Sequence, residues 1–226
     1  MFAPKCQAAG LSFRAMALGL LVSAPFSGCA NPADDAFKAA ATAPRDTETK
    51  PAAREIGEGS PRMLEITTSG SKVEFVGSKV TGNHAGGFKM FSGFAALSED
   101  LKSLETVSVT IDMKSTWSDN DKLTEHLKNA DFFDVTKFPE STFRSTEIKA
   151  GGEKGASHTL TGNLTLHGVT KSISVPATIT LSDQGAKLAS EFAINRKDFG
   201  ISYPGKADDL IRDDVLIKLE LTANKP

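Results

Sequence analysis

The chain has 226 residues, with 26 lysines and arginines against 28 aspartates and glutamates, so its formal net charge is only −2. This balance, with no basic patch of interleaved aromatic residues, argues against nucleic acid as a partner. The two cysteines are Cys6 and Cys29, so the chain beyond Cys29 has no thiol for a disulfide, a nucleophile or a metal site.

Residues 1–28 have the composition of a signal peptide of the lipoprotein type. The basic residues Lys5 and Arg14 precede an apolar run at residues 15–24, and no acidic residue occurs before Asp34. The run is too short to span a bilayer, but it suits the apolar core of a secretory signal. We therefore expect the chain to be exported to the periplasmic side of the bacterial cell envelope.

The sequence FSGC at residues 26–29 resembles a bacterial lipobox, in which a small pair precedes the cysteine that becomes the acylated N-terminus. The expected product is a lipoprotein that is anchored to a membrane through lipidated Cys29. Ordinary cleavage near Ala24 or Ala30 is the alternative, and it would leave a soluble periplasmic protein.

Residues 29–62 differ in composition from the rest of the chain, because alanine, proline, threonine and mixed charges dominate. Phe37 and Ile56 are the large apolar residues of this segment. A segment that buries so little apolar surface does not offset its loss of entropy on folding, so we predict a disordered tether. As a flexible coil it would span roughly 30 Å between the anchor and the folded domain.

From residue 63 onward the chain reads as short strands of alternating polarity. The clearest pattern is at 106–113, where Val107, Val109 and Ile111 alternate with polar residues, as in a strand with one dry face. The expected strands are 72–79, 87–94, 106–113, 141–148, the two arms of a hairpin around His167-Gly168, 187–194 and 213–222. These eight strands indicate an antiparallel all-β domain, either an up-and-down barrel or a sandwich.

Residues 120–139 interrupt the series of strands. A capping sequence at 119–121 precedes residues 122–129, which contain two leucines four positions apart, and this pattern predicts a short helix. The next segment, ADFFDVTKFP at 130–139, contains three phenylalanines. We expect a phenylalanine-rich insert of this kind to close the end of a barrel or to line its mouth.

Four motifs follow one another along the chain: ADFFDVTKFPESTFRST at 130–146, GNLTLHGVTKSISVP at 162–176, NRKDFGI at 195–201 and IRDDVLIKLELTA at 211–223. Together they resemble the YceI-like family of bacterial exported lipid-binding proteins. The resemblance implies that residues 63–226 form a lipocalin-like, antiparallel eight-stranded β-barrel. It also implies that a polyisoprenoid, or another long-chain apolar amphiphile, binds inside the barrel.

Such a ligand sets a simple physical requirement for the site. An eight-stranded barrel has an interior about wide enough for side chains or one slender ligand. Burying about 400 Å² of an apolar chain supplies roughly 10 kcal/mol before association costs. The site is therefore expected to be apolar. The candidate lining residues are Phe75, Trp117, Phe132, Phe133, Phe138, Phe143, Phe192 and Phe199. For each of them, ordinary packing in the core is the alternative role.

Arg196, in the NRKDFGI motif, is the candidate for a contact with the head group of the ligand, because a guanidinium group binds phosphate well. A structural ion pair at a turn is the alternative role for this residue. The four histidines, His84, His126, His158 and His167, lack the spacing of metal ligands, and neither a nucleophile motif nor a phosphate-binding loop occurs. We therefore expect no metal site, no cofactor and no enzymatic activity.

Two functions remain open from the sequence. The preferred one is to sequester or carry a long-chain isoprenoid, or a similar fatty amphiphile, in the cell envelope. The alternative is a non-enzymatic interaction or stress-response module, with a barrel core filled by side chains and loops that bind an unidentified protein partner. An empty apolar cavity supports the first function, and a filled core supports the second.

Overall fold

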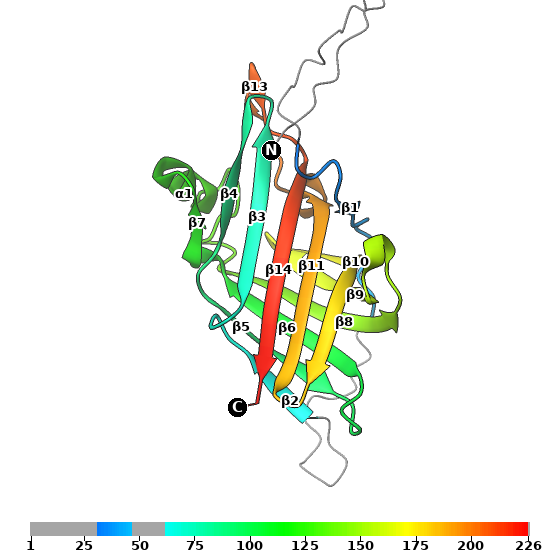
Figure 1. The fold of residues 1–226 in the computed structure, drawn as a ribbon. Coiled ribbons are helices and arrows are strands. Elements are labelled where there is room, and N and C mark those ends of the chain that lie inside the picture. The colour runs from blue at the N-terminus through cyan, green and yellow to red at the C-terminus, as the bar shows by residue number, and fades with distance from the viewer. Residues whose placement is uncertain (1–30, 47–61, 226) are drawn as a thin grey trace, which may run out of the picture.

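The computed structural model describes residues 31–46 and 62–225. In this part of the chain one large sheet curves into a barrel (Figure 1). Its strands are β1 (Phe37–Lys38), β2 (Arg62–Ile66), β3 (Lys72–Lys79), β4 (Gly82–Phe88), β5 (Phe91–Leu97), β6 (Leu104–Asp112), β7 (Thr116–Ser118), β8 (Glu140–Ala150), β9 (His158–Leu166), β10 (Val169–Ser182), β11 (Gly185–Asn195) and β14 (Asp214–Asn224). The other elements are η1 (Met113–Ser115), α1 (Asp121–Lys128), η2 (Glu153–Gly155), η3 (Arg196–Phe199), β12 (Gly205–Lys206) and β13 (Asp209–Leu210).

Hydrogen bonds join the strands of the barrel in the order β11-β10-β9-β8-β6-β5-β2-β14, and β14 pairs again with β11. This last pairing closes the ring, and each pair within the ring is antiparallel. The described residues therefore form a closed, eight-stranded antiparallel barrel. This confirms the fold class predicted from the sequence.

Several barrel strands are interrupted and continue past the ring. β2 and β3 pair in succession with β14, so that Ile66 lies opposite Ala223 and Val73 lies opposite Leu219. β5 and β4 pair with β2 and β3, and β6 and β7 pair with β5 and β4. β3, β4 and β7 thus form a branch that extends one end of the barrel, with α1 beside it (Figure 1).

The expected single strand at 87–94 is wrong, because it spans the interruption between β4 and β5. There the backbone N–H groups of Lys89 and Met90 donate to the carbonyl and hydroxyl oxygens of Ser115. Ser115 belongs to η1, so the break between β4 and β5 meets the break between β6 and β7. The alternation of inward and outward residues restarts after each break. Alternation in the sequence therefore does not show where a break lies.

The hairpin of β9 and β10 has the predicted two-residue turn. Leu166 pairs with Val169, which leaves His167 and Gly168 as the turn. Both turn residues have positive φ, 52° for His167 and 74° for Gly168, as a type I′ turn requires. The turn fixes the register and therefore sends the leucines of β9 to one face.

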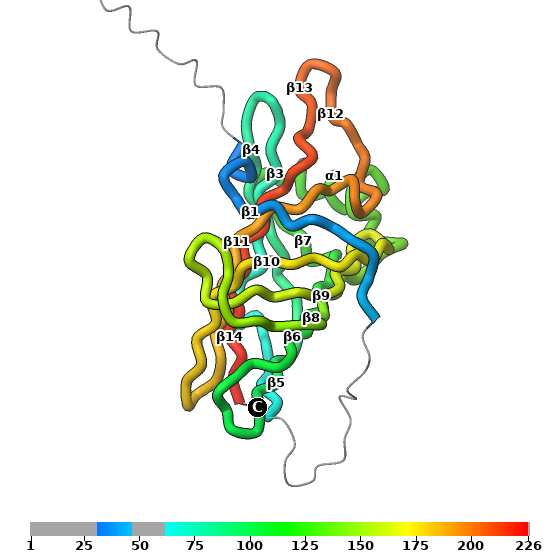
Figure 2. Tube along the Cα trace, turned by 90° about the vertical axis from the view of Figure 1, so that its right-hand side faces the viewer, coloured from blue at the N-terminus to red at the C-terminus, as the bar shows by residue number. Residues whose placement is uncertain are grey.

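Residues 31–46, which we call the strap, are ordered. β10 pairs with β11 only from Thr178 to Ser182, and before this its pairing is with β9. The strap runs along the part of β11 that β10 leaves free and then reaches β10 (Figure 2). β1 pairs in parallel with β11 at Phe192, and the backbone of Thr42 bonds that of Ser172.

The expected disordered tether is therefore wrong for residues 31–46. Ala33 is fully buried and packs with Ala193 and Leu216, while Asn31 is 4% exposed. Buried small side chains, backbone hydrogen bonds and an ion pair between Lys38 and Asp214 at 2.6 Å hold the strap, together with Phe37, which packs against the core. A composition rule that counts large apolar residues does not detect most of these contacts. The predicted signal peptide at 1–28, Cys29 and the remaining tether at 47–61 lie outside the described residues.

Candidate functional site

A cavity of about 190 Å³ lies inside the barrel. Inward-facing residues of the barrel strands form most of its wall, and nearly all of them are apolar. Representative lining residues are Val107, Val109 and Ile111 of β6, and Val215, Ile217 and Leu219 of β14. These are the faces that period-two alternation predicts to be dry.

The two ends of the barrel differ in what lies beyond the cavity. At the end of the barrel nearest the C-terminus, the core is filled by side chains that do not line the cavity: Leu64, Ile66, Leu97, Leu104, Ala186 and Ala223. The opposite end is covered by α1 and residues 129–138, which we call the lid segment. Leu127, Phe132 and Phe133 of the lid segment contribute to the cavity wall.

Three phenylalanines meet under the lid segment. The ring centroids of Phe75 and Phe88 are 5.8 Å apart, and that of Phe133 lies 6.1 Å from Phe75 and 6.0 Å from Phe88. The rings are tilted or edge-on to one another, which is the favourable arrangement for aromatic pairs. Because these rings come from β3, β4 and the lid segment, they join the lid to the barrel wall.

Two glycines make room for aromatic rings in this wall. A Cβ atom at Gly86 would lie 2.5 Å from Cζ of Phe75, and one at Gly162 would lie 2.4 Å from Cζ of Phe143. Gly86 pairs directly with Phe75 across the β3–β4 ladder. The rings therefore lie over strand backbone that bears no side chain, so that two large residues fit within a narrow barrel.

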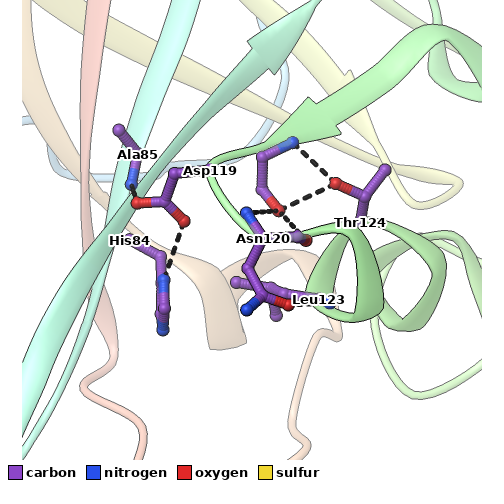
Figure 3. Close-up of polar contacts among 7 residues, drawn as sticks. His84, Ala85, Asp119, Asn120, Leu123 and Thr124 are labelled. Carbon is purple, nitrogen blue, oxygen red and sulfur yellow. Dashed lines mark hydrogen bonds and ion pairs between the residues drawn. The ribbon is translucent and has the colours of Figure 1, made fainter.

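Hydrogen bonds at the start of α1 fix the position of the helix (Figure 3). Asn120 is the N-cap, and its side-chain oxygen accepts from the backbone N–H of Leu123 at 3.1 Å. The backbone N–H of Ser118 donates to the hydroxyl of Thr124 at 2.8 Å. The predicted helix is confirmed, although it spans Asp121–Lys128 rather than 122–129.

Asp119 ties the lid segment to β4. One oxygen of its carboxylate lies 2.8 Å from Nδ1 of His84, and the other accepts from the N–H of Ala85 at 3.0 Å (Figure 3). Burial alone would raise the pKa of Asp119, but the hydrogen bonds from His84 and Ala85 outweigh it and lower the pKa below its ordinary value. The folded state therefore favours the ionised carboxylate.

A second aromatic group holds the far end of α1. The ring of His126 lies edge-on to Phe132 and Tyr203, with centroids 5.0 Å and 5.2 Å away. Nε2 of His126 is also 2.8 Å from a carboxylate oxygen of Asp131. Since Phe132 is only 7% exposed, this group seats the lid segment on the barrel and against the 196–204 segment.

The structure brings most of the predicted aromatic residues together. The candidates that line the cavity are Phe75, Phe132, Phe133, Phe143 and Phe192. Phe88 also lines it and was not predicted, because the adjacent glycines and the strand break hide the alternation of β4. Ile201 and Ile211 lie outside regular strands, so no periodic signal marks them.

Trp117, Phe138 and Phe199 do not line the cavity, contrary to expectation. Trp117 lies on β7, which among the described strands pairs with β4 alone, and its indole nitrogen packs against Gly87. Phe138 lies outside the wall, with its ring centroid 4.6 Å from that of His167. Phe199 is fully buried in η3. Proximity to the lid segment in sequence therefore does not bring a side chain to the cavity.

Arg196 lines the cavity, but its donors are already engaged. The guanidinium donates to the carbonyl oxygens of Ile201 at 2.7 Å, Arg212 at 3.1 Å and Ile211 at 3.4 Å. It also pairs with a carboxylate oxygen of Asp213 at 3.2 Å. Burial lowers the pKa of Arg196, while Asp213 raises it.

An arginine has five N–H donors, so these contacts leave little capacity for a ligand. The geometry therefore favours the structural role of Arg196 over the head-group contact. Ser141, another polar residue of the wall, donates its hydroxyl to the carbonyl oxygen of Thr165 at 2.8 Å. The wall therefore offers mainly apolar contacts to a molecule in the cavity.

Among residues 31–46 and 62–225, no group of three or more His, Cys, Asp or Glu side chains is arranged to hold a metal ion. In the same ranges, no helix combines the length and the apolar character that crossing a membrane requires.

A closed antiparallel barrel around an apolar cavity, with a short helix over one end, defines the class of lipocalin-like barrels. Residues 64–223 match the family described as the YceI-like domain, and the chain belongs to this family. The resemblance found in the four sequence motifs is thereby confirmed.

Relatives and solved structures agree with this assignment. A UPF0312 protein of Pseudomonas putida is 34% identical over 139 residues, which cover 59% of this chain and 71% of the relative. Protein YceI of Salmonella arizonae is 38% identical over 125 residues, which cover 52% of this chain and 63% of the relative.

Among solved structures, BcnA of Burkholderia cenocepacia is similar with a TM-score of 0.62 and 25% identity, covering 70% of this chain and 99% of BcnA. A polyisoprenoid-binding domain from Saccharophagus degradans is similar with a TM-score of 0.57 and 17% identity, covering 74% of this chain and 99% of that domain. At that identity the second likeness shows the shared fold.

Proposed function

We propose that this protein binds a long-chain isoprenoid, or a similar fatty amphiphile, inside its barrel and carries or sequesters it in the bacterial cell envelope. The observation that supports the proposal most directly is the apolar cavity under the lid segment. Its wall has the composition that a hydrocarbon chain requires, and the polar groups of Arg196 and Ser141 are engaged by the protein itself. This arrangement supports a binding function.

The size of the cavity bears on how the ligand is held. A closed apolar cavity of about 150 Å³ accepts a molecule the size of benzene, and the present cavity measures about 190 Å³. A long chain that lies wholly inside the barrel therefore needs a wider cavity than this one. We infer that Phe132 and Phe133 move outward with the lid segment when the ligand enters.

The location in the envelope rests on the sequence at residues 1–29. We propose export, lipidation of Cys29 and anchoring on the periplasmic side, with a soluble periplasmic form as the alternative. The alternative function as a protein-interaction module predicted a filled core, and the cavity counts against it.

Native mass spectrometry of the mature chain, followed by organic extraction, tests the proposed function. The protein must retain residues 31–46, because the strap belongs to the barrel wall. We expect a stoichiometric apolar ligand, or uptake of an added prenol. A mass without ligand, together with no uptake of prenol or fatty-acid probes, would refute lipid binding.

Phe133→Asp tests the position of the site, because it places a carboxylate in the cavity wall. We expect prenol affinity to fall at least about tenfold, since burying an unpaired charge is costly. Phe138→Asp is the matched control, because Phe138 lies on the same lid segment but outside the wall. Equal losses in two folded variants would contradict the placement of the site.

A further inference from the structure

The strap restricts where a membrane anchor at Cys29 can lie. Ala33 is fully buried on the outer side of the barrel, in a cluster with Ala193, Leu216 and the nearby Val76. Cys29 is four residues before Ala33, and four extended residues reach at most about 14 Å. A membrane anchor at Cys29 would therefore lie within about 14 Å of this cluster.

The end of the molecule at the turn between β3 and β4, which we call the first pole, lies at a comparable distance from this cluster. β3 continues past Val76 to Lys79, and the turn residue Val80 is four residues beyond Val76, or about 13 Å further along the strand direction. The opposite pole lies farther from the cluster, because β14 continues from Leu216 to Asn224, about 26 Å the other way. When the barrel axis stands across the membrane plane, the first pole is therefore the one nearer to an anchor at Cys29.

This pole carries two adjacent apolar side chains in solvent. The turn after β3 and the β12–β13 hairpin project together from this end of the barrel (Figure 1). Val80 is 53% exposed and Leu210 is 49% exposed, and the N–H of Val80 donates to the carbonyl oxygen of Leu210 at 3.2 Å. We call the turns at 79–83 and 205–210 the tip.

The charges of the tip are balanced. Its two basic residues, Lys79 and Lys206, equal in number its two acidic residues, Asp208 and Asp209. Nζ of Lys79 lies 2.5 Å from a carboxylate oxygen of Asp209. The tip therefore presents apolar side chains without a net charge, which suits contact with a lipid surface irrespective of the charge of its head groups.

We propose that the tip rests on the lipid bilayer, with Val80 and Leu210 in its interfacial layer, so that the lid end of the barrel faces the membrane. This inference rests on the anchoring at Cys29 put forward in the proposed function. An apolar ligand would then pass between the bilayer and the barrel at the lid end, with little exposure to water.

Fluorescence quenching in vesicles tests this orientation. The full chain is expressed with its leader, and bimane is attached at Val80→Cys, Leu210→Cys or the control Leu101→Cys. Leu101 is 43% exposed and lies by the opposite pole, next to Gly185 and Lys225. In phosphatidylcholine vesicles that contain doxyl-labelled lipid, we expect quenching at Val80 and Leu210 and little at Leu101.

The possible failures are distinguishable. Equal quenching at both poles would overturn the orientation while leaving the anchor in place. A native chain that binds vesicles no better than Cys29→Ser would overturn the anchor and this inference together. Prenol affinity in detergent solution, measured on the same preparations, reports separately on ligand binding.

A second measurement uses ligand transfer. Val80→Asp combined with Leu210→Asp should slow the uptake of prenol from vesicles roughly tenfold, because two apolar contacts with the bilayer are lost. Its prenol affinity in detergent should not change, since neither residue lines the cavity. Leu101→Asp is the control, and uptake by the double variant as fast as by this control would overturn the proposal.

Discussion

Replacement of Gly86 by alanine tests how the cavity wall is built, because it places a methyl group where the ring of Phe75 lies. The new Cβ atom would lie 2.5 Å from Cζ of Phe75 and 2.6 Å from the carbonyl oxygen of Trp117. Both distances are far below the 3.4 Å at which ordinary contact begins. Because the oxygen belongs to the backbone, both the ring and the strand must shift.

The expected effect follows from these contacts. Overpacking in a dense interior costs about 1–3 kcal/mol, and replacing a glycine offsets roughly 0.5–1 kcal/mol of this through chain entropy. We therefore expect Gly86→Ala to lower the free energy of unfolding by about 1–2 kcal/mol. Prenol affinity should also fall, because the displaced ring of Phe75 takes up cavity volume. Urea unfolding and prenol titration measure the two effects.

Gly77→Ala is the matched control for stability. A Cβ atom at Gly77 meets nothing within 4 Å, and the residue lies on the same β3–β4 hairpin. This variant should be as stable as the native chain, or up to about 1 kcal/mol more stable. If Gly86→Ala and Gly77→Ala unfold at the same urea concentration, the argument that residue 86 must be glycine to admit Phe75 is refuted.

Two further predictions concern polar groups. Arg196→Leu should lower the free energy of unfolding by about 2–4 kcal/mol, because buried carbonyl oxygens and Asp213 lose their donor; a loss of ligand affinity at unchanged stability would instead indicate a head-group contact. The lowered pKa of Asp119 means that its contribution to stability is present above its unfolded pKa of about 3.9 and is lost as the pH falls through the folded value. The stability difference between the native chain and Asp119→Asn should therefore shrink below about pH 4, and a difference that is constant in urea titrations through this range would count against the role of Asp119.

The barrel was predictable from the sequence because most of its strands have one face toward the apolar interior. At 106–113 and 213–222, apolar residues therefore occur at every second position, and these residues are on the faces that line the cavity. The helix was predictable for a similar reason, since its N-cap and its two leucines are local signals. The interruption at 89–90 was not predictable, because a hydrogen bond to Ser115 depends on a distant part of the chain.

The candidate site was predictable only where a residue lies on a regular strand or next to α1. Phe75, Phe143 and Phe192 occupy inward positions of strands, and their faces follow from alternation. Phe199 lies in η3 and Phe138 in a loop, where periodicity assigns no face. Whether such a side chain reaches the cavity depends on the tertiary path of the loop.

The strap shows a second limit of composition as a guide to order. A segment rich in alanine buries little apolar area per residue, so it does not form a core by itself. It can still pack when a preformed sheet leaves backbone groups free, as β11 does beyond its pairing with β10. Alanine then has an advantage, because its small side chain allows Ala33 to approach the sheet closely.

The two ends of the barrel differ for a physical reason, and the difference indicates where a ligand enters. At the end nearest the C-terminus, β2, β5 and the ends of β11 and β14 pair with one another, and buried aliphatic side chains fill the interior. At the other end the strands are interrupted, β10 leaves β11, and the lid segment closes the gap largely through aromatic contacts and a few polar ones. Opening the first end would break a continuous ladder of backbone hydrogen bonds, whereas opening the second requires the lid segment to separate from the wall. The path of lower cost therefore lies at the lid end.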